Sequence, residues 1–290
     1  QSAKRLTSSA TVEFAPHITL TNSAFRFIVG EQLQDMDIDP GPILIEPEAK
    51  NTAAAILAAS IFAHSKDQNS ILLVAPSDHV ISDTLYFHEA ISTGLSHIES
   101  GMMVTFGIKP THAETGYGYL ELSQGSLDEC GTSNLLNFVE KPDLKQAEKM
   151  LAAGNFLWNA GIFLFKAKNM IDAFEACAPE TLSLVSKAVS NASVDLGFLR
   201  LAEDPWSMLD NISIDYAIME KANNLVAVPY KSKWSDLGDW DAVWSENGPD
   251  LSGNVTTDTA YAIECSNSLL RSESDKQQMV GIGLENIIAI

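Results

Sequence analysis

Three features of the sequence predict an α/β fold followed by a small β appendage. Short apolar runs alternate with helical patterns over the first 110 residues, which is typical of βαβ units and a parallel sheet. The rhythm then changes to glycine-rich turns, further strands and helices. From about residue 252 the chain becomes a run of short β-like segments separated by Ser, Asn and Asp, and this pattern predicts a coil of short strands.

Composition narrows the class of protein. The 290 residues are enough for one large domain, or for one domain with an appendage. Hydrophobic residues make up 46% of the chain without forming a run of membrane-spanning length, so a soluble protein is expected. The 38 acidic and 18 basic residues give a net charge of −20, which argues against nucleic acid or an anionic membrane as a partner.

Cysteine usage predicts a reducing compartment. Cys130, Cys177 and Cys265 are widely separated and odd in number, which fits neither a disulfide framework nor a zinc cluster. No positively charged start followed by an apolar core indicates a signal peptide. We therefore expect the protein in the cytoplasm.

In the first part of the chain, apolar runs bounded by Pro, Gly and polar clusters predict strands, and longer apolar or amphipathic stretches predict helices. The expected strands are 18–21, 43–45, 71–75 and 103–108, and the expected helices are 25–33, 51–64 and 86–100, after a weakly helical start at 1–10. The helix at 51–64 is apolar nearly all round, so it should be buried. Asn51 or Thr52 is its expected N-cap.

In the second part, turn residues separate the elements. A turn at 115–119 enters a strand, and further strands are expected at 135–140, 160–165 and 225–229. Helices are expected at 143–153, 169–177, 180–189 and 214–221, with Gly154 ending the first and Ser213 capping the last. The segment 234–240 is a loop that leads into one more helix, for which Asp239 is the expected cap.

The stretch ILLVAPSDHVI at residues 71–81 holds the first candidate site residue. A buried strand stops at Pro76 and delivers Ser77, Asp78 and His79 to its carboxyl end. In open α/β sheets ligands bind outside the carboxyl ends of the strands, so Asp78 is placed for chemistry. The alternative is that Asp78 caps the next helix or closes a turn.

A second acidic residue, Asp236, lies in the aromatic and glycine-rich segment WSDLGDW. If the fold brings Asp78 and Asp236 together, their two carboxylates make a Mg²⁺ site with waters and phosphate oxygens. The alternative for Asp236 is a turn cap before Gly238. The six histidines show no zinc-binding spacing, and the sequence contains no GxSxG motif.

A helix start suggests an anion site. Glu46 ends a strand, and the helix after it begins at Asn51 and Thr52. Its free backbone N–H groups and positive helix end would attract an anion. Ordinary helix capping explains the same residues.

Two further segments could contact a sugar phosphate. Lys141 stands between a strand end and a proline, where it could meet a phosphate as a point charge, and Glu140 could accept hydrogen bonds from sugar hydroxyls. A solvated charge pair is the alternative. Gly116-Tyr117-Gly118 permits close approach of the backbone to a ligand, although a plain tight turn explains the glycines equally well.

Taken together and in this order, these motifs resemble the nucleotidyltransferase domain of the mannose-1-phosphate guanylyltransferase family. The matching stretches span nearly the whole chain: FRFIVGEQL (25–33), ILIEPEAKNTAAA (43–55), LLVAPSDHVI (72–81), ETGYGYL (114–120), FVEKP (138–142), WNAGIFLF (158–165), SIDYAIMEK (213–221) and WSDLGDW (234–240). The EKP and TGYGY-like stretches are shared with sugar nucleotidyltransferases at large, whereas SIDYAIMEK and WSDLGDW look particular to this branch.

The resemblance implies a fold and a reaction. The fold is a Rossmann-like, GT-A-like mixed sheet in residues 1–250, followed by the start of a left-handed β-helix in residues 251–290. The reaction is transfer of GMP from GTP to mannose 1-phosphate, giving GDP-mannose and pyrophosphate, with Mg²⁺ as cofactor.

The resemblance also implies a role for each candidate residue. The metal is held by Asp78 and Asp236, and the sugar phosphate is met by Lys141. The sugar ring is held by Glu140, Asn159 and the turn of Gly116, Tyr117 and Gly118. The segment at the nucleotide contains Glu46, Lys50, Asn51 and Thr52.

Two features depart from the family pattern. Lys50 stands where relatives carry Arg, which keeps the charge but loses the bidentate fork. The family's N-terminal Gly-rich loop, GGxGxRLWPxSR followed by a PK pair, has no match in residues 1–29. Because phosphoryl transfer depends on such cations, we expect these residues alone to be close to inactive and the full-length protein to be active.

Three alternatives stay open. The donor could be UTP, CTP or dTTP, because pocket details that set base choice are not readable from the sequence. A non-catalytic relative that binds a sugar nucleotide and regulates a partner would fit the absent loop. The open β appendage would allow copies of the chain to pair, so a homo-oligomer is the third alternative.

Overall fold

A computed structural model describes residues 3–7, 9, 11–123 and 131–290, and Cys130 lies outside them. Contacts divide the chain into a first unit, Gln1–Ser77 with Ile81–Lys233, and a second unit, Asp78–Val80 with Trp234–Ile290. None of the helices in the described ranges is long and apolar enough to cross a membrane. Within the same ranges, Cys177 and Cys265 are free thiols.

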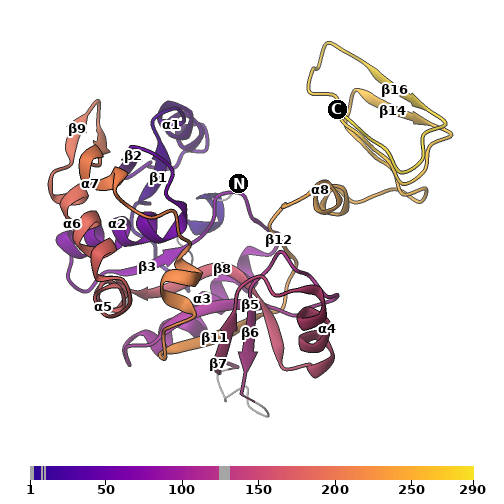
Figure 1. Ribbon diagram of the computed structural model, residues 1–290. Coiled ribbons are helices and arrows are strands. Elements are labelled where there is room, and N and C mark those ends of the chain that lie inside the picture. Colours follow the sequence, from indigo (N-terminus) through magenta and orange to yellow (C-terminus); the bar gives the residue numbers. More distant parts are fainter. Residues whose placement is uncertain (1–2, 8, 10, 124–130) are drawn as a thin grey trace. The chain divides into compact units, whose positions relative to one another are not determined.

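A six-stranded mixed sheet forms the centre of the first unit (Figure 1). Its strands are, in spatial order, β3 (Ile71–Val74), β8 (Phe156–Lys166), β5 (Met103–Ile108), β11 (Leu225–Tyr230), β7 (Ser133–Val139) and β6 (Tyr119–Leu122). β5 and β11 are parallel, whereas β8 runs antiparallel to β3 and β5. The first residues of β8 also pair with β6. This long strand therefore carries Asn159, opposite Gly107, into the middle of the sheet.

A smaller sheet lies beside the first helices. It consists of β1 (Thr19–Asn22), β2 (Ile43–Glu46), β10 (Phe198–Arg200) and β9 (Ser193–Asp195), in that order. β1 and β10 run parallel to β2, and α1 (Arg26–Gln34) follows β1. The apolar residues of β2 are buried, so Glu46 stands at the end of an inner strand.

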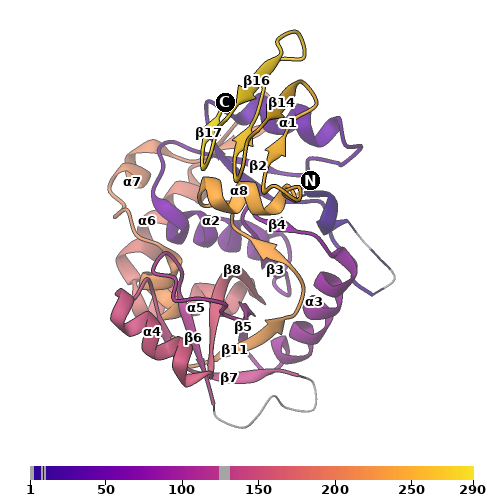
Figure 2. The same cartoon turned by 90° about the vertical axis from the view of Figure 1, so that its right-hand side faces the viewer.

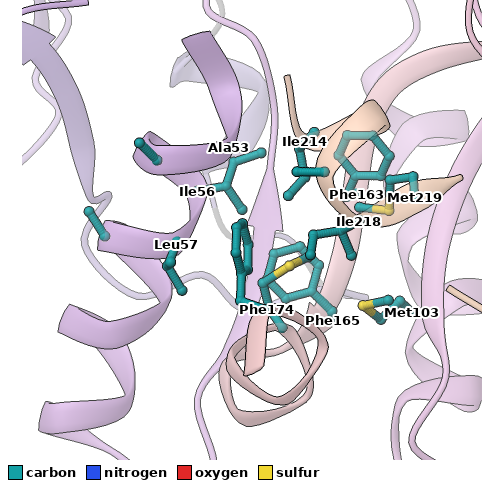
Figure 3. Close-up of a cluster of buried hydrophobic side chains, with 14 of the residues drawn as sticks. Ala53, Ile56, Leu57, Met103, Phe163, Phe165, Phe174, Ile214, Ile218 and Met219 are labelled. Atoms are coloured by element: carbon teal, nitrogen blue, oxygen red, sulfur yellow. The ribbon is translucent and has the colours of Figure 1, made fainter. Parts of the chain in front are cut away.

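One large apolar cluster packs between helices and the central sheet. Its helical residues come from α2 (Asn51–Lys66), α5 (Ala167–Cys177), α6 (Pro179–Ser190), α7 (Glu203–Ser207) and the π-helical turn η2 (Asp215–Met219). Figure 3 shows Leu57 of α2, Phe174 of α5 and Ile218 of η2 beside Phe165 of β8. The many alanines of α2 allow these neighbours to approach closely, which explains why a helix apolar nearly all round is buried here.

The other face of the central sheet is covered by α3 (Thr84–Ile98). Phe87 of α3 contacts Phe106 of β5, with ring centroids 6.2 Å apart. A Cβ on Gly94 would lie 3.0 Å from Leu164 and 3.2 Å from Val104, so the helix packs directly on β8 and β5. α4 (Leu144–Ala153) is capped as predicted, because Asp143 accepts from the Gln146 N–H at 2.8 Å and Gly154 adopts φ 73°. Helices thus cover both faces of the sheet, as the α/β prediction requires.

The second unit contains the predicted coil. β4 (Val80–Ile81) pairs with β12 (Trp234–Ser235), and α8 (Trp240–Glu246) comes next, capped by Asp239 as expected. β13 (Val255–Thr256), β15 (Leu269–Leu270) and β17 (Ile288–Ala289) stack in parallel. β14 (Ala260–Ile263) and β16 (Met279–Ile282) form a second parallel pair, visible in Figure 2. This parallel stacking confirms a small β appendage.

Several local predictions were wrong. Neither Asn51 nor Thr52 is the N-cap of α2, because Lys50 holds that place without a side-chain bond and Asn51 begins the helix at φ 60°. β3 lies at the sheet edge with Ile71 exposed, because among the described strands it pairs with β8 alone. β8 begins at Phe156 rather than residue 160, and the helix expected at 214–221 is the shorter η2. β4, β9, β10, β12, α7 and the turn η1 (Ala3–Leu6) were not predicted as such.

Candidate active site

Glu140 follows β7, and the structure buries its carboxylate. Its side chain keeps only 9% of its surface exposed, and its backbone N–H donates to Oε1 of Glu220 at 3.2 Å. A Cβ on Gly118 would lie 2.5 Å from Oε2 of Glu140 and 3.3 Å from the Cβ of Asn159. A glycine at this position therefore lets the carboxylate and β8 come together.

Burial also changes the acidity of this carboxyl group. Burial raises the pKa of Glu140 to about 7, with a further contribution from Asp215, and Lys141 opposes the change. The pKa of Asp215 is raised too, again mainly because the carboxyl group is buried. Near neutral pH, Glu140 therefore exchanges between a charged acceptor and a neutral donor form.

Lys141 adopts a left-handed backbone conformation with φ 47°. Its Nζ lies 3.8 Å from Oε1 of Glu140, and 59% of its side chain is exposed. A non-glycine residue in this region costs on the order of 1 kcal/mol and persists where the surrounding structure holds it, as at many functional sites. The exposed ammonium group on this constrained turn is available to an anionic ligand.

Asn159 is nearly buried in β8, with 9% of its surface exposed. Its Nδ2 donates to Oδ1 of Asp215 at 3.1 Å, and its Oδ1 accepts from the Thr105 hydroxyl at 2.9 Å. Its backbone N–H donates to the Gly118 carbonyl at 2.7 Å. These bonds connect β8 to β5, to η2 and to the turn before β6 at one point.

The Gly116–Tyr117 turn is held by its own neighbours. The Gly116 N–H donates to Oε1 of Glu114 at 2.7 Å, and this bond is the main reason why the pKa of Glu114 is lowered. The Tyr117 ring meets Trp158 edge-on, with centroids 5.2 Å apart. The structure therefore contains the tight turn, which also brings Gly118 against Glu140.

The start of α2 uses several of its backbone donors within the protein. The Thr52 N–H donates to Oδ1 of Asn51 at 2.9 Å, and the Ala53 N–H donates to the Ile212 carbonyl at 3.3 Å. The Thr52 hydroxyl accepts from the Ile214 N–H at 2.9 Å. The helix end therefore offers fewer free donors to an anion than we expected.

Lys50 and Glu46 differ in how well they are paired. Lys50 donates to Oε1 of Glu48 at 3.0 Å and to the Ser207 carbonyl at 3.1 Å. Burial raises the pKa of Glu46 to about 7, and its Oε1 is buried without a hydrogen-bond partner among the residues that the structure describes. A buried carboxyl oxygen without a donor costs free energy, which a ligand donor would offset.

A pocket of about 370 Å³ joins two of these segments. Its lining residues are Asn51, Thr52, Glu140, Lys141, Asn211, Ile212, Ser213, Asp215 and Tyr216. It thus brings the α2 start together with the Glu140–Lys141 pair. Gly118 and Asn159 contact the wall of this pocket through Glu140 and Asp215, whereas Glu46, Lys50, Gly116 and Tyr117 do not line it.

Asp78 and Asp236 flank one short ladder in the second unit. Asp78 precedes β4, Asp236 follows β12, and these strands pair. The rings of His79 and Trp234 meet edge-on at 5.3 Å. Oδ1 of Asp236 accepts from the Gly238 N–H at 3.0 Å, so this carboxylate also closes the turn that we considered as its alternative role.

The donor set near this ladder fits Mg²⁺ better than a metal with a full protein cage. No group of three or more His, Cys, Asp or Glu residues that could hold a metal occurs within residues 3–7, 9, 11–123 and 131–290. The protein would supply two hard carboxylates and leave the other positions to water and phosphate oxygens. Mg²⁺ is commonly bound in this way.

Sequence reasoning missed Asp215 and Thr105. Asp215 lies in the quoted motif SIDYAIMEK, but its neighbour Ser213 was considered only as a cap. Ser213 does accept from the Tyr216 N–H, at 3.4 Å. Thr105 lies inside an apolar strand, where no pattern distinguishes it from a buried filler.

Comparisons with known proteins agree with this arrangement. A mannose-1-phosphate guanylyltransferase of Sinorhizobium fredii is 39% identical over 290 residues, which is 100% of this chain and 56% of that protein. The xanthan biosynthesis protein XanB of Xanthomonas campestris (strain B100) is 36% identical over 98% of this chain and 59% of its own length. The chain therefore spans a little more than half the length of these relatives.

Solved structures resemble the fold. A crystal structure described as mannose-1-phosphate geranyltransferase from Thermus thermophilus matches 93% of this chain and 76% of its own, with TM-score 0.78 and 27% identity. One described as mannose-6-phosphate isomerase from Helicobacter pylori matches 75% of this chain and 84% of its own, with TM-score 0.68 and 28% identity.

The match to a protein family is the broadest of these findings. The nucleotidyl transferase family matches residues 4–252, and its enzymes generally use a divalent metal ion. The matched range includes every candidate site residue and both sheets of the first unit. The chain belongs to the nucleotidyl transferase family.

Proposed function

We propose that the full-length protein transfers GMP from GTP to mannose 1-phosphate and releases GDP-mannose and pyrophosphate. The observation that carries this proposal is the pocket in which the start of α2 meets Glu140 and Lys141. A nucleotide and a sugar phosphate must lie next to each other for this transfer. The names of the similar guanylyltransferases support the choice of substrates.

Each candidate residue has a role in this proposal. Lys141 meets the phosphate of the sugar. The sugar ring is bound by Glu140, Asn159 and the turn of Gly116, Tyr117 and Gly118. The nucleotide is bound by Glu46, Lys50, Asn51 and Thr52. The buried Oε1 of Glu46, without a partner in the described part of the chain, supports a ligand N–H at that position.

The reaction is an in-line displacement at the α-phosphorus of GTP. A phosphate oxygen of mannose 1-phosphate forms the new P–O bond, while the bond from the α-phosphorus to the bridging oxygen of the β-phosphate breaks. The electron pair of that bond leaves with pyrophosphate, and no covalent enzyme intermediate is needed. The protein contributes positioning and charge, since the chemistry itself requires little covalent work from it.

The residues divide this work by their chemistry. The Lys141 ammonium group offsets the charge of the incoming phosphate. Glu140 and Asn159 hold the sugar so that its phosphate oxygen points to the α-phosphorus. Asp78 and Asp236 would hold Mg²⁺, which supplies positive charge to the phosphate oxygens when bound.

The proposal extends to organisation and location. Residues 1–250 form the nucleotidyltransferase domain, and residues 251–290 form the start of an appended β-helix. The protein works in the cytoplasm, where its substrates are made, and needs neither nucleic acid nor a membrane.

Steady-state assays of the full-length protein test the reaction and the metal assignment. Asp78→Ala and Asp236→Ala should each lower kcat/KM by about 10²-fold or more, because charge stabilisation of the transferred group is lost. Asp172→Ala is the matched control, since this exposed carboxylate pairs with Lys168 on α5, away from the candidate site residues. Near-normal rates in both site variants would refute the metal assignment. A wild type that forms no GDP-mannose would refute the reaction.

Ligand-induced thermal shifts test the nucleotide separately. GTP should raise the melting temperature of the full-length protein more than UTP, CTP or dTTP does. A larger shift with another nucleotide would replace GTP in the proposal. Stabilisation by GDP-mannose without any turnover would favour a non-catalytic regulator instead.

A further inference from the structure

The side-chain amide of Asn159 is held at three points. Its Oδ1 accepts from the Thr105 hydroxyl at 2.9 Å and from the Gly161 N–H at 3.1 Å. Its Nδ2 donates to Oδ1 of Asp215 at 3.1 Å. Both acceptor positions of the amide oxygen are thus filled, and one N–H of the amide nitrogen remains for a ligand.

The reversed orientation of this amide is unfavourable. The Gly161 N–H can only donate, so an amide NH₂ group in the place of Oδ1 would face another donor. The amide oxygen would at the same time face the carboxylate of Asp215. Asn159 can therefore act on a ligand as a donor only.

Thr105 strengthens this orientation from beneath the site. It lies on β5, its side chain is completely buried, and it is not among the residues that line the pocket. Its hydroxyl lies closer to Oδ1 of Asn159 than to the Ile162 carbonyl, at 2.9 Å against 3.5 Å. An effect of this hydroxyl on a ligand must therefore pass through Asn159.

An acceptor stands next to this fixed donor. The Cα of Gly118 separates Oε2 of Glu140 from the Cβ of Asn159, and an added Cβ there would contact both. A sugar bound at this point would meet a hydrogen-bond donor and a carboxylate side by side. Each sugar hydroxyl can accept from one and donate to the other.

We propose that Thr105 is a positioning residue for the sugar, whose hydroxyl fixes the Asn159 amide so that its remaining N–H donates to a sugar oxygen beside Glu140. The inference rests on the proposed function, because the positioned ligand is the sugar of mannose 1-phosphate. Thr105 itself touches no substrate.

Substitutions of Thr105 in the full-length protein test this inference. Thr105→Val removes the hydroxyl while keeping a similar shape, and should raise the KM for mannose 1-phosphate about 3–10-fold, the effect of one hydrogen bond. The KM for GTP should stay unchanged. Thr105→Ser keeps the hydroxyl and should restore the KM for mannose 1-phosphate. A KM in Thr105→Ser as high as in Thr105→Val would overturn the proposal.

A double-mutant cycle separates positioning from a general structural role. Because Thr105 acts through Asn159, Thr105→Val should add nothing to the KM of an Asn159→Ala variant. An equal loss on both backgrounds would mean that Thr105 acts by packing, and the inference would be wrong.

The wild type is measured first, so that the two proposals can fail separately. If it makes GDP-mannose but the Thr105 variants behave alike, the function stands and the positioning role falls. If it binds mannose 1-phosphate by calorimetry without turnover, the function falls, and Kd replaces KM in the same comparison. If it neither binds nor converts mannose 1-phosphate, both proposals are refuted.

Discussion

Among the single residues, Glu140 has the most direct consequence for stability. Its pKa is 4.5 in an ordinary setting and about 7 in the fold, chiefly because the carboxyl group is buried. Between these values the folded protein binds more protons than the unfolded chain. Glu140 therefore contributes stability that is fully present below pH 4.5 and is lost as the pH rises through 7.

Glu140→Gln should remove this pH dependence, because the amide does not titrate. The free energy of unfolding of the variant, relative to wild type, should increase between pH 4.5 and pH 8 by about 3 kcal/mol at most. Urea unfolding at several pH values measures this difference. Glu46 shares the raised pKa but is present in both proteins, so it cancels. A difference that does not change with pH would contradict the buried acid.

Gly118→Ala should separate Glu140 from β8. The added Cβ would lie 2.5 Å from the Glu140 carboxylate and 3.3 Å from Phe138, so the variant should lose about 1–3 kcal/mol of stability. It should also weaken mannose 1-phosphate binding in the full-length protein. Denaturant unfolding and calorimetry measure the two effects.

Gly30→Ala is the matched control for this substitution. A Cβ on Gly30 in α1 would meet nothing within 4 Å, so this change should raise stability by about 0.5–1 kcal/mol. If both alanine variants were equally stable, the close approach at Gly118 would not matter.

At the scale of elements, the coil of the second unit depends on buried polar corners. Asn254 is buried, donates to the Cys265 carbonyl at 2.8 Å and accepts from the Ser268 N–H at 3.2 Å. One side chain thereby connects two successive turns of the coil. Backbone groups that lose such a partner inside a fold are costly.

Asn254→Ala should destabilise the coil by about 1–3 kcal/mol, because a backbone donor and acceptor lose their partner. Hydrogen exchange should lose protection across residues 254–290, while α2 and β5 keep theirs. Gln278→Ala removes an exposed amide from the same coil and should change little. Equal exchange in the two variants would show that the corner contributes nothing.

The elements that could be predicted are those that carry their own signals. The apolar α2 and the Asp143–Gly154 caps of α4 are local features, and they were correct. β4, β9, β10 and β12 are two or three residues long, and distant partners define them. The N-cap of α2 was wrong because the Thr52 hydroxyl is occupied by the Ile214 N–H, a contact made only in the folded chain.

At the scale of the whole molecule, the net charge of −20 opposes compaction. Raising NaCl from about 20 to about 200 mM should therefore raise the melting temperature by a few degrees, about 1 kcal/mol in stability. A variant with Asp35, Asp37 and Asp39 changed to Asn carries less charge and should respond less. Asp37 has φ 55°, which Asn tolerates well. An equal salt response would argue against self-repulsion.

The candidate site is predictable from the sequence only in part. Glu140 and Lys141 could be proposed from one short motif, and the pocket places them beside Asn51 and Thr52. No pattern within a segment could show that Asp215 would orient Asn159, because that contact joins η2 to β8. Sequence patterns thus identified the ligand-facing residues better than the residues that hold them.

The turn η2 can also be considered as a single-residue insertion in a helix. The Glu220 N–H donates to the Asp215 carbonyl at 3.0 Å, five residues back rather than four. Deleting one residue here would rotate the chain before the turn by about 100° relative to the chain after it. Asp215 would leave the pocket while Ala217, Ile218 and Met219 stayed in the core. Insertions and deletions in this segment would therefore act on the pocket as changes of direction rather than of length.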